Sequence, residues 1–205
     1  FLWNFLLRKI DLIVKKNING LIFVSKATRR NIYENTSLYS KKIREKVIYN
    51  GINIAYTKEK NKKVDKLFKN NSRLKVGMLS RIEPNKGHEN LVNVINELPI
   101  KFKRKLMVYF IGMGQQKYLD KFKKKIKKFE LNSYFKFTGY IDEESPIILK
   151  RLDLLLSLTK DFEGFGLSVA ESLSVNTPVL ATKVGGITEF LNDKNSLLIK
   201  PNNQK

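Results

Sequence analysis

Two glutamates, Glu163 and Glu171, have the type and spacing to bind sugar hydroxyls beside a phosphate group. Seven residues separate them, and these include Gly164 and Gly166 on either side of Phe165. A glycine turn at a helix start leaves backbone N–H groups free beside the positive end of the helix dipole, where a phosphate can sit. Carboxylates suit sugar hydroxyls instead, because they accept O–H hydrogen bonds. A plain strand-to-helix turn with small residues is the other interpretation of the two glycines.

The flanking residues place this stretch between a strand and a helix. Residues 153–158 form an apolar run of the length expected for a fully buried strand. From Gly166 onward, Leu167, Ala170 and Leu173 recur at three- and four-residue spacing, which is typical of a helix. The glycines therefore lie in the turn between a predicted strand and a predicted helix.

The same alternation of strand and helix runs through the second part of the chain. Such a rhythm predicts right-handed βαβ units and a Rossmann-like parallel sheet with helices on both faces. Ligands of these sheets bind in the loops at the carboxyl ends of the strands. The predicted strands are 74–80, 106–111, 135–138, 153–158, 179–181 and 197–200, and the predicted helices are 89–98, 115–130, 143–150, one from 166 and one from 185 to 191.

Two cations follow the first of these strands. Arg81 and Lys86 lie just past residue 80, with Gly87 and His88 next. Two cations at a strand end could bind a pyrophosphate, although solvated loop charges give the same pattern. The lone His88 is interpreted as a helix-start residue rather than a catalyst.

Two further loops carry glycines after strands. Gly112 opens a helix, but Lys117 replaces the third glycine of a dinucleotide motif, so no dinucleotide site is expected. Gly139, followed by Tyr140 and Ile141, ends the next strand, and a glycine there lets a flat ring approach the backbone.

The N-terminal part has its own elements. Residues 21–24 and 47–49 are predicted strands, and Ser25 is the predicted N-cap of a helix over 26–34. Residues 1–16 form an amphipathic pattern that suits a helix packed on a sheet or one lying at a membrane surface. The polar, lysine- and asparagine-rich residues 55–73 predict a linker with one helical turn near 64–68.

Composition limits the possible chemistry. The chain has 205 residues, no cysteine and one histidine, which excludes a disulfide framework, a cysteine metal site and a multi-histidine metal site within it. Its formal net charge of +21 favours an anionic partner such as a phosphorylated substrate, an anionic membrane or nucleic acid, or else reflects a compositional bias. The predicted helix 115–130 carries many of the lysines around an apolar stripe at Tyr118, Phe122, Ile126 and Phe129, which we expect to face the core.

Residues 74–200 resemble the nucleotide-sugar half of retaining GT-B glycosyltransferases of family 4. The resemblance rests on the Glu-x7-Glu motif at 163–171, on Arg-x4-Lys-Gly at 81–87, and on the runs Thr-Pro-Val-Leu-Ala-Thr at 177–182 and Val-Gly-Gly-Ile-Thr-Glu-Phe-Leu at 184–191. Asn176 departs from the glycine usual in the family, but asparagine tolerates the left-handed conformation needed there. The resemblance implies domain boundaries at 1–54 for the end of an acceptor domain whose beginning lies upstream, 55–73 for a linker and 74–205 for the donor domain, truncated at its C-terminus.

The resemblance also implies roles for single residues. Arg81 and Lys86 would neutralise the leaving diphosphate, Glu163 would bind hydroxyls of the donor sugar, and Glu171 would bind the ribose. Further contacts to the nucleotide sugar are expected from Gly87, Gly112, Tyr140, Ile141, Gly164, Phe165, Gly166 and Leu167, while Glu189 is interpreted as structural. No metal and no cofactor other than the nucleoside diphosphate sugar are expected.

The expected activity is transfer of a sugar to a lipid-linked or saccharide acceptor with retention, in cell-envelope polysaccharide, lipopolysaccharide or glycolipid synthesis. The expected location is the cytoplasm, with the inner face of the cytoplasmic membrane as a peripheral site. This chain alone is expected to be inactive. A non-catalytic nucleotide-sugar-binding subunit and a basic nucleic-acid-binding α/β protein are the alternatives, but the second leaves Glu163 and Glu171 unexplained.

Overall fold

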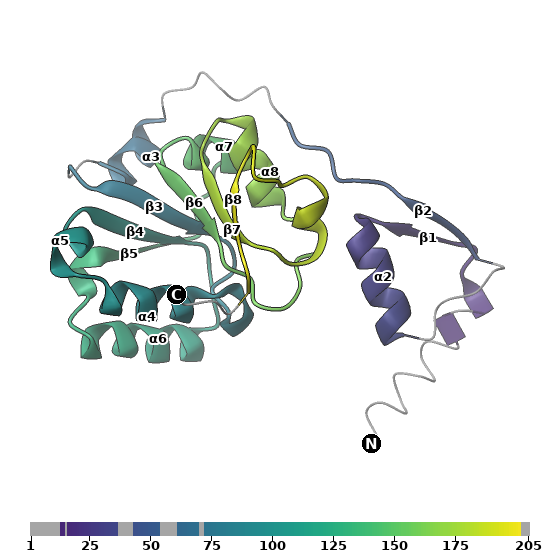
Figure 1. Cartoon of the computed structure of the whole chain (residues 1–205), viewed down its shortest axis with the longest axis horizontal. Coiled ribbons are helices and arrows are strands. Elements are labelled where there is room, and N and C mark those ends of the chain that lie inside the picture. Colours follow the sequence, from purple (N-terminus) through teal and green to yellow (C-terminus); the bar gives the residue numbers. More distant parts are fainter. Residues whose placement is uncertain (1–12, 15, 37–42, 54–60, 70–71, 202–205) are drawn as a thin grey trace.

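The fold is known from a computed structural model that describes residues 13–14, 16–36, 43–53, 61–69 and 72–201. Its centre is a six-stranded, all-parallel sheet with the strand order β5-β4-β3-β6-β7-β8 (Figure 1). The strands are β3 (Leu74–Leu79), β4 (Leu106–Ile111), β5 (Phe135–Gly139), β6 (Leu154–Ser157), β7 (Val179–Thr182) and β8 (Leu197–Ile199). The predicted Rossmann-like α/β class is confirmed.

The strand order reverses between β3 and β6. The chain adds β4 and β5 on one side of β3 and then returns to place β6, β7 and β8 on the other side. The pairs Val76–Leu154 and Gly77–Leu155 join the two halves. A crevice opens at the carboxyl ends of the strands where such an order reverses, so this point is where a ligand site is expected.

Helices cover both faces of the sheet (Figure 1). On one face, α4 (His88–Glu97) and α6 (Gln116–Lys128) pack in a core with Phe110 and Phe135. On the other face, α3 (Lys62–Leu67), α7 (Ser145–Leu149) and α8 (Leu167–Ser174) pack in a second core with Tyr109 and Leu155. The short helices α5 (Ile100–Lys103), η1 (Pro84–Lys86), η2 (Asn132–Tyr134) and η3 (Gly185–Glu189) complete the domain.

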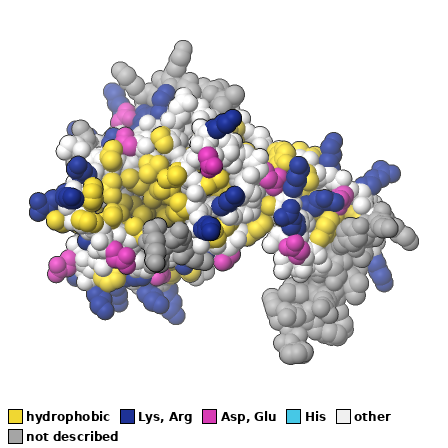
Figure 2. All heavy atoms as spheres, viewed as in Figure 1, with side chains coloured by type: hydrophobic (Ala, Val, Ile, Leu, Met, Phe, Trp, Pro, Cys, Tyr) yellow, Lys and Arg dark blue, Asp and Glu magenta, His cyan; other side chains and the backbone are white. Residues whose placement is uncertain are grey.

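The apolar stripe of α6 faces the core as predicted. Phe122 and Ile126 are buried, and Tyr118 and Phe129 pack against the same cluster. The lysines of α6 therefore lie around a buried stripe. Lys and Arg side chains on the visible face are spread over both parts of the molecule rather than gathered in one stripe (Figure 2).

The first residues described form a small unit of their own. Strand β1 (Gly20–Phe23) pairs in parallel with β2 (Arg44–Val47), and α2 (Lys26–Asn35) connects them. Ser25 caps α2 as predicted, since its side chain accepts a hydrogen bond from the Thr28 N–H. The prediction of a strand over 47–49 was wrong in its bounds, because the observed strand β2 ends at Val47. Its partner β1 ends at Phe23, and after Phe23 the chain turns into α2. Of the amphipathic pattern over 1–16, residues 1–12 and 15 lie outside the described part.

Three other predicted elements differ in extent. The helix predicted over 143–150 is the shorter α7, which starts after Glu144 with Pro146 in its first turn. The helix predicted over 185–191 is the shorter 3-10 helix η3, and its first residue, Gly185, has a φ of 58°, which lies outside the right-handed helical region. The turn predicted near 64–68 is α3, and its Val64 and the adjoining Phe68 are buried in the core.

Asn176 behaves as the sequence predicts. Its φ is 59°, in the left-handed region, and its N–H binds the carbonyl of Leu173 just beyond the end of α8. The helix therefore closes without the glycine that is more usual at such a position.

Candidate functional site

An open pocket of about 470 Å³ lies where the strand order reverses. The ends of β3 and β6 form its floor, and the loop before α8 and the start of α8 form one wall. Its lining residues are Val24, Asn50, Met78, Leu79, Ser80, Arg81, Lys86, Leu156, Ser157, Leu158, Thr159, Glu163, Phe165, Gly166, Leu167 and Ser168. Six residues predicted for the site therefore meet in one pocket: Arg81, Lys86, Glu163, Phe165, Gly166 and Leu167.

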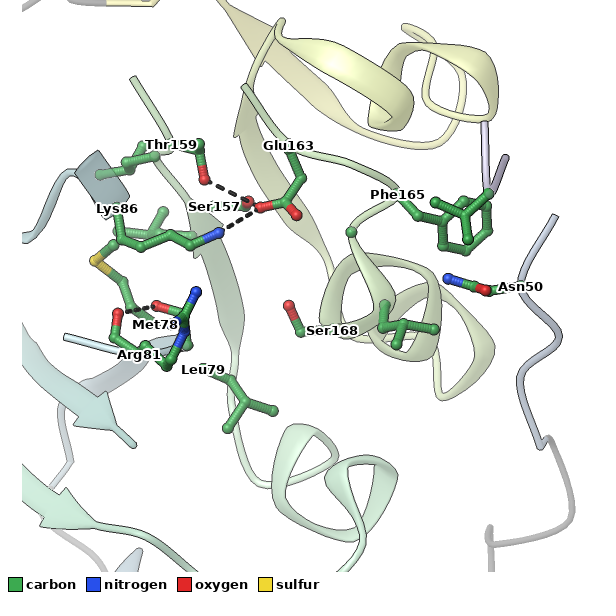
Figure 3. A pocket seen from close by; sticks show the side chains of 16 residues that line it. Asn50, Met78, Leu79, Arg81, Lys86, Ser157, Thr159, Glu163, Phe165 and Ser168 are labelled. Carbon is green, nitrogen blue, oxygen red and sulfur yellow. Dashed lines mark hydrogen bonds and ion pairs between the residues drawn. The ribbon is translucent and has the colours of Figure 1, made fainter. Parts of the chain in front are cut away.

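An ion pair spans this pocket. Lys86 Nζ donates to Glu163 Oε2 at 2.8 Å, and the Thr159 hydroxyl donates to the same oxygen at 3.2 Å (Figure 3). The two charged side chains are only 18% and 20% exposed. A partly buried pair is screened less than a surface pair, so each charge is held in a fixed direction towards the pocket.

Backbone contacts fix the loop that carries Lys86. Gly87 has a φ of 80°, and a Cβ there would overlap the carbonyl oxygen of Leu158. The Lys160 N–H donates to the carbonyl of Asn85 at 2.8 Å. The loops after β3 and β6 are therefore tied to each other, which sets the distance between Lys86 and Glu163.

Arg81 is the more exposed of the two predicted cations. Its side chain is 76% exposed and pairs with Glu83 at 3.0 Å. It lines the same pocket as Lys86 (Figure 3). A long exposed side chain gains little from such a surface pair, so Arg81 can turn to an anion entering the pocket at small cost.

The start of α8 closes another side of the pocket. Gly166 precedes the helix with a φ of 88°, and a Cβ there would overlap the Ile187 side chain. Among the described residues, no side chain caps this helix end. The N–H groups at Leu167 and Ser168 therefore remain for a ligand, because the first N–H groups of a helix have no partner inside it.

The second glutamate of the motif lies elsewhere. Glu171 is one turn into α8, partly buried, and does not line the pocket that contains Glu163. Burial raises its pKa above the ordinary value, although a hydrogen bond with the Ser145 side chain acts in the opposite direction. Its predicted ribose contact stays a prediction.

The remaining predicted residues also lie outside the lining of this pocket. Gly112 donates its N–H to the carbonyl of Gly139 at 3.0 Å, which joins the loops after β4 and β5. Tyr140 is 70% exposed, whereas the Ile141 side chain belongs to the core and only its backbone is available. Gly87 and Gly164 shape the adjoining loops.

Sequence reasoning missed five polar residues of the pocket: Asn50, Ser80, Ser157, Thr159 and Ser168. Thr159 follows directly after the strand predicted over 153–158, so its position at a strand end was a signal for it. Its backbone is held as well, because the Thr182 hydroxyl donates to the Thr159 carbonyl at 2.5 Å. No local pattern pointed to Asn50, which reaches the pocket from the N-terminal unit.

His88 starts α4 as predicted, but its ring is fully buried. It contacts the rings of Phe110 and Phe122, with centroid distances of 5.2 and 6.3 Å. Neither ring nitrogen makes a hydrogen bond of normal geometry with the described residues, although the Glu83 backbone is near enough to oppose the effect of burial on the pKa of the ring. Burial lowers the pKa of His88 to about 4, so the ring is neutral and packs as part of the core.

The described residues hold no candidate metal site and no membrane-spanning helix. In that part of the chain, no three His, Asp or Glu side chains come together as a metal site. The helices seen there are also too short or too polar to cross a membrane.

The chain belongs to the family Glycosyl transferases group 1, whose sequence profile matches residues 59–205. The six-stranded parallel sheet with helices on both faces is the Rossmann-like domain of a GT-B fold, and this part of the chain is therefore of the glycosyltransferase class.

Individual relatives agree with this family. An uncharacterized glycosyltransferase of Methanocaldococcus jannaschii is 28% identical over 199 residues, which are 95% of this chain and 49% of the relative. Mannosylfructose-phosphate synthase of Agrobacterium fabrum is 30% identical over 115 residues, 53% of this chain and 25% of that enzyme. The crystal structure of Anabaena HepE in complex with UDP and glucose superimposes with a TM-score of 0.83 and 23% identity, over 98% of this chain and 55% of HepE. The chain spans about half the length of the first two curated relatives it matches.

Proposed function

We propose that this chain forms the donor half of a retaining glycosyltransferase of family 4, which moves a sugar from a nucleoside diphosphate sugar to an acceptor hydroxyl. The observation that carries the proposal is the ion pair between Lys86 and Glu163 at the point where the strand order reverses. A cation and a carboxylate held side by side suit a ligand with a charged diphosphate next to a neutral, hydroxyl-rich sugar.

The diphosphate is placed by the charges of the pocket. Lys86, Arg81 and the first N–H groups of α8 line one space, so they can surround an anion together. Negative charge grows on the diphosphate as the sugar–phosphate bond breaks, and fixed positive groups stabilise that charge most in the transition state. With two cations in the pocket, the leaving group needs no divalent ion.

The sugar is placed by Glu163. Its Oε2 atom already accepts hydrogen bonds from Lys86 and Thr159, so Oε1 remains as an acceptor for a sugar hydroxyl. A carboxylate that accepts hydrogen bonds from two donors keeps its orientation when the sugar binds. A fixed acceptor of this kind holds the sugar in one reactive geometry. Glu163, Arg81 and Lys86 are therefore the proposed catalytic residues.

The nucleoside lies towards β4 and β5 in this proposal. Backbone groups at Gly112, Tyr140 and Ile141 would contact the base, and Glu171 would accept from the ribose hydroxyls. UDP and UDP-glucose are ligands in Anabaena HepE crystal structures, which makes them the first donors to test.

The remaining proposals concern the whole protein. The acceptor is a lipid-linked or saccharide hydroxyl in cell-envelope polysaccharide or glycolipid synthesis, and the protein works in the cytoplasm at the inner face of the membrane. The excess of lysine supports the membrane surface as a partner, because basic residues are attracted to anionic lipids.

Isothermal titration tests the donor site. We expect the chain to bind one nucleoside diphosphate from a panel, and Arg81→Ala and Glu171→Ala each to weaken that binding about tenfold. Arg104→Ala is the matched control, because Arg104 is an exposed arginine beyond the end of α5. A folded chain that binds no nucleoside diphosphate or its sugar would refute the proposal.

A further inference from the structure

The start of α2 is docked on the loop that carries Glu163. Two N–H groups of its first turn, those of Lys26 and Ala27, donate to the carboxylate of Glu189 at 3.1 and 2.8 Å. Glu189 is more than 160 residues away in the sequence and lies at the end of η3. A carboxylate at a helix N-terminus is stabilising because it satisfies free N–H groups and faces the positive end of the dipole.

Glu189 is held from a third direction by Tyr49, whose hydroxyl donates to it at 2.8 Å. Burial acts to raise the pKa of Glu189, but the hydrogen bonds from Ala27, Tyr49 and Lys26 outweigh it, and the pKa lies below the ordinary value. The carboxylate is therefore charged at neutral pH and joins α2, η3 and the segment after β2.

Two hydroxyls of α2 reach the loop itself. Ser25 Oγ and Thr28 Oγ1 lie 2.6 and 3.1 Å from the carbonyl oxygen of Gly164, and 2.9 Å from each other. Ser25 is fully buried. A partly buried carbonyl with two hydroxyl donors is well fixed, because breaking the bond from the buried Ser25 leaves a polar group without a partner.

The other side of the loop is held by the glycine pair that opens η3. The Gly186 N–H donates to the carbonyl of Glu163 at 2.7 Å. A Cβ at Gly185 would overlap the Glu163 backbone, and a Cβ at Gly186 would overlap the carbonyl oxygen of Gly164. The backbone at Glu163 and Gly164 is therefore enclosed between η3 and α2.

We propose that Glu189, Ser25 and Thr28 are positioning residues that clamp the backbone at Glu163, so that its side chain meets the donor sugar in one orientation. The proposal rests on the proposed function. Glu189 holds α2 in place, the two hydroxyls of α2 hold the Gly164 carbonyl, and Glu163 is the neighbouring residue whose carboxylate enters the pocket (Figure 3). The position of α2 therefore influences how tightly the sugar binds, and it does not influence how tightly the diphosphate binds.

The ratio of two affinities measures this coupling. Titration with UDP reports the diphosphate site, and titration with UDP-glucose reports that site plus the sugar contact. We expect Glu163→Gln to remove the tighter binding of UDP-glucose. Glu189→Gln and Thr28→Val should each reduce the ratio of the two affinities about fivefold while UDP affinity stays the same.

Matched variants separate positioning from general damage. Thr28→Ser keeps the hydroxyl and should keep the ratio, and Glu97→Gln removes an exposed carboxylate at the end of α4 and should change neither affinity. Glu189→Gln added to Glu163→Gln should have no further effect on the ratio, because both act on one contact. Equal losses of UDP and UDP-glucose affinity, or an unchanged ratio in Glu189→Gln and Thr28→Val, would overturn the proposal.

Amide hydrogen exchange tests the clamp without a nucleotide. Glu189→Gln should speed exchange about tenfold at the N–H groups of Lys26, Ala27 and Gly186, because their partners are lost or shifted. Unchanged exchange at Gly186 would refute the clamp even in a chain that binds UDP-glucose. Faster exchange at Gly186 in a chain that binds no nucleotide would refute the proposed function and leave the clamp in place.

Discussion

The loops that follow β3 and β6 are tied to each other, whereas the loops that follow β4 and β5 present exposed side chains on glycine turns. In the first pair, Lys86 binds Glu163 and the Lys160 N–H binds Asn85. In the second pair, Met113 and Tyr140 are 64% and 70% exposed, and the Gly112 N–H donates to the Gly139 carbonyl at 3.0 Å. Charges that must stabilise a leaving group need fixed positions, while a flat ring needs only an accessible backbone.

A glycine substitution in each region gives the largest contrast. Gly87 and Gly139 both have positive φ, at 80° and 69°, but a Cβ at Gly87 overlaps the Leu158 carbonyl and a Cβ at Gly139 meets no atom within 4 Å. We expect Gly87→Ala to lower the free energy of unfolding by about 4 kcal/mol and Gly139→Ala by about 1 kcal/mol. Urea denaturation measures both, and equal losses would show that the two regions are equally crowded.

Removing the charge of Lys86, in the loops after β3 and β6, should have the next largest effect, and it should act on the affinity for UDP. Lys86→Met keeps the length of the side chain but leaves Glu163 with Thr159 alone, and it removes the partly buried cation that we propose as a diphosphate contact. We expect UDP affinity to fall about a hundredfold, equivalent to about 2.7 kcal/mol. Lys121→Met on the exposed face of α6 is the matched control for the loss of one charge. A loss no larger than that of the control would remove Lys86 from the site.

The sequence predicted the separate strands, helices and site residues around the loops after β3 and β6, but it did not predict which of these residues contact one another. Strand and helix periods gave the α/β class, and the cap of α2 at Ser25 is a local signal that the structure confirms. The pairing of Lys86 with Glu163 joins residues 77 positions apart, and it depends on the strand order, which no local pattern encodes. The contact of Ser25 with Gly164 was missed for the same reason, since 139 positions separate them.

For His88, too, the sequence did not reveal contacts with residues from other elements. The burial of this histidine leads to the third prediction. The sequence placed it correctly at a helix start, but its burial is set by Phe110 and Phe122, which come from other elements. Its folded pKa of about 4 lies below the ordinary value of 6.5, so the unfolded chain takes up a proton between these values and the folded chain does not. Stability must therefore fall as the pH drops from 6.5 towards 4.

We expect His88 to account for a loss of about 2 kcal/mol in the free energy of unfolding between pH 6.5 and 4.5. The lowered carboxylate pKa values, such as that of Glu189, act mainly below about pH 5, and the raised pKa of Glu171 acts with the opposite sign, so the difference between the unchanged chain and His88→Leu gives the share of the histidine. Urea denaturation across the window should give a much shallower profile for His88→Leu than for the unchanged chain. A slope in that variant equal to that of the unchanged chain would assign the effect to another group.

The smallest effect is expected at Tyr140, in the loop after β5. If backbone groups of this loop hold the base, the exposed ring contributes little, and Tyr140→Ala should change UDP affinity by less than about threefold, or about 0.6 kcal/mol. A stacked base would instead lose about 1 to 3 kcal/mol when the ring is removed. Isothermal titration of Tyr140→Ala and Lys86→Met therefore decides whether the loop after β5 would bind the base through its backbone or through the Tyr140 ring. A loss approaching that of Lys86→Met would mean that the β5 loop binds the nucleotide through its side chain, and the contrast between the two pairs of loops would then be one of exposure rather than of function.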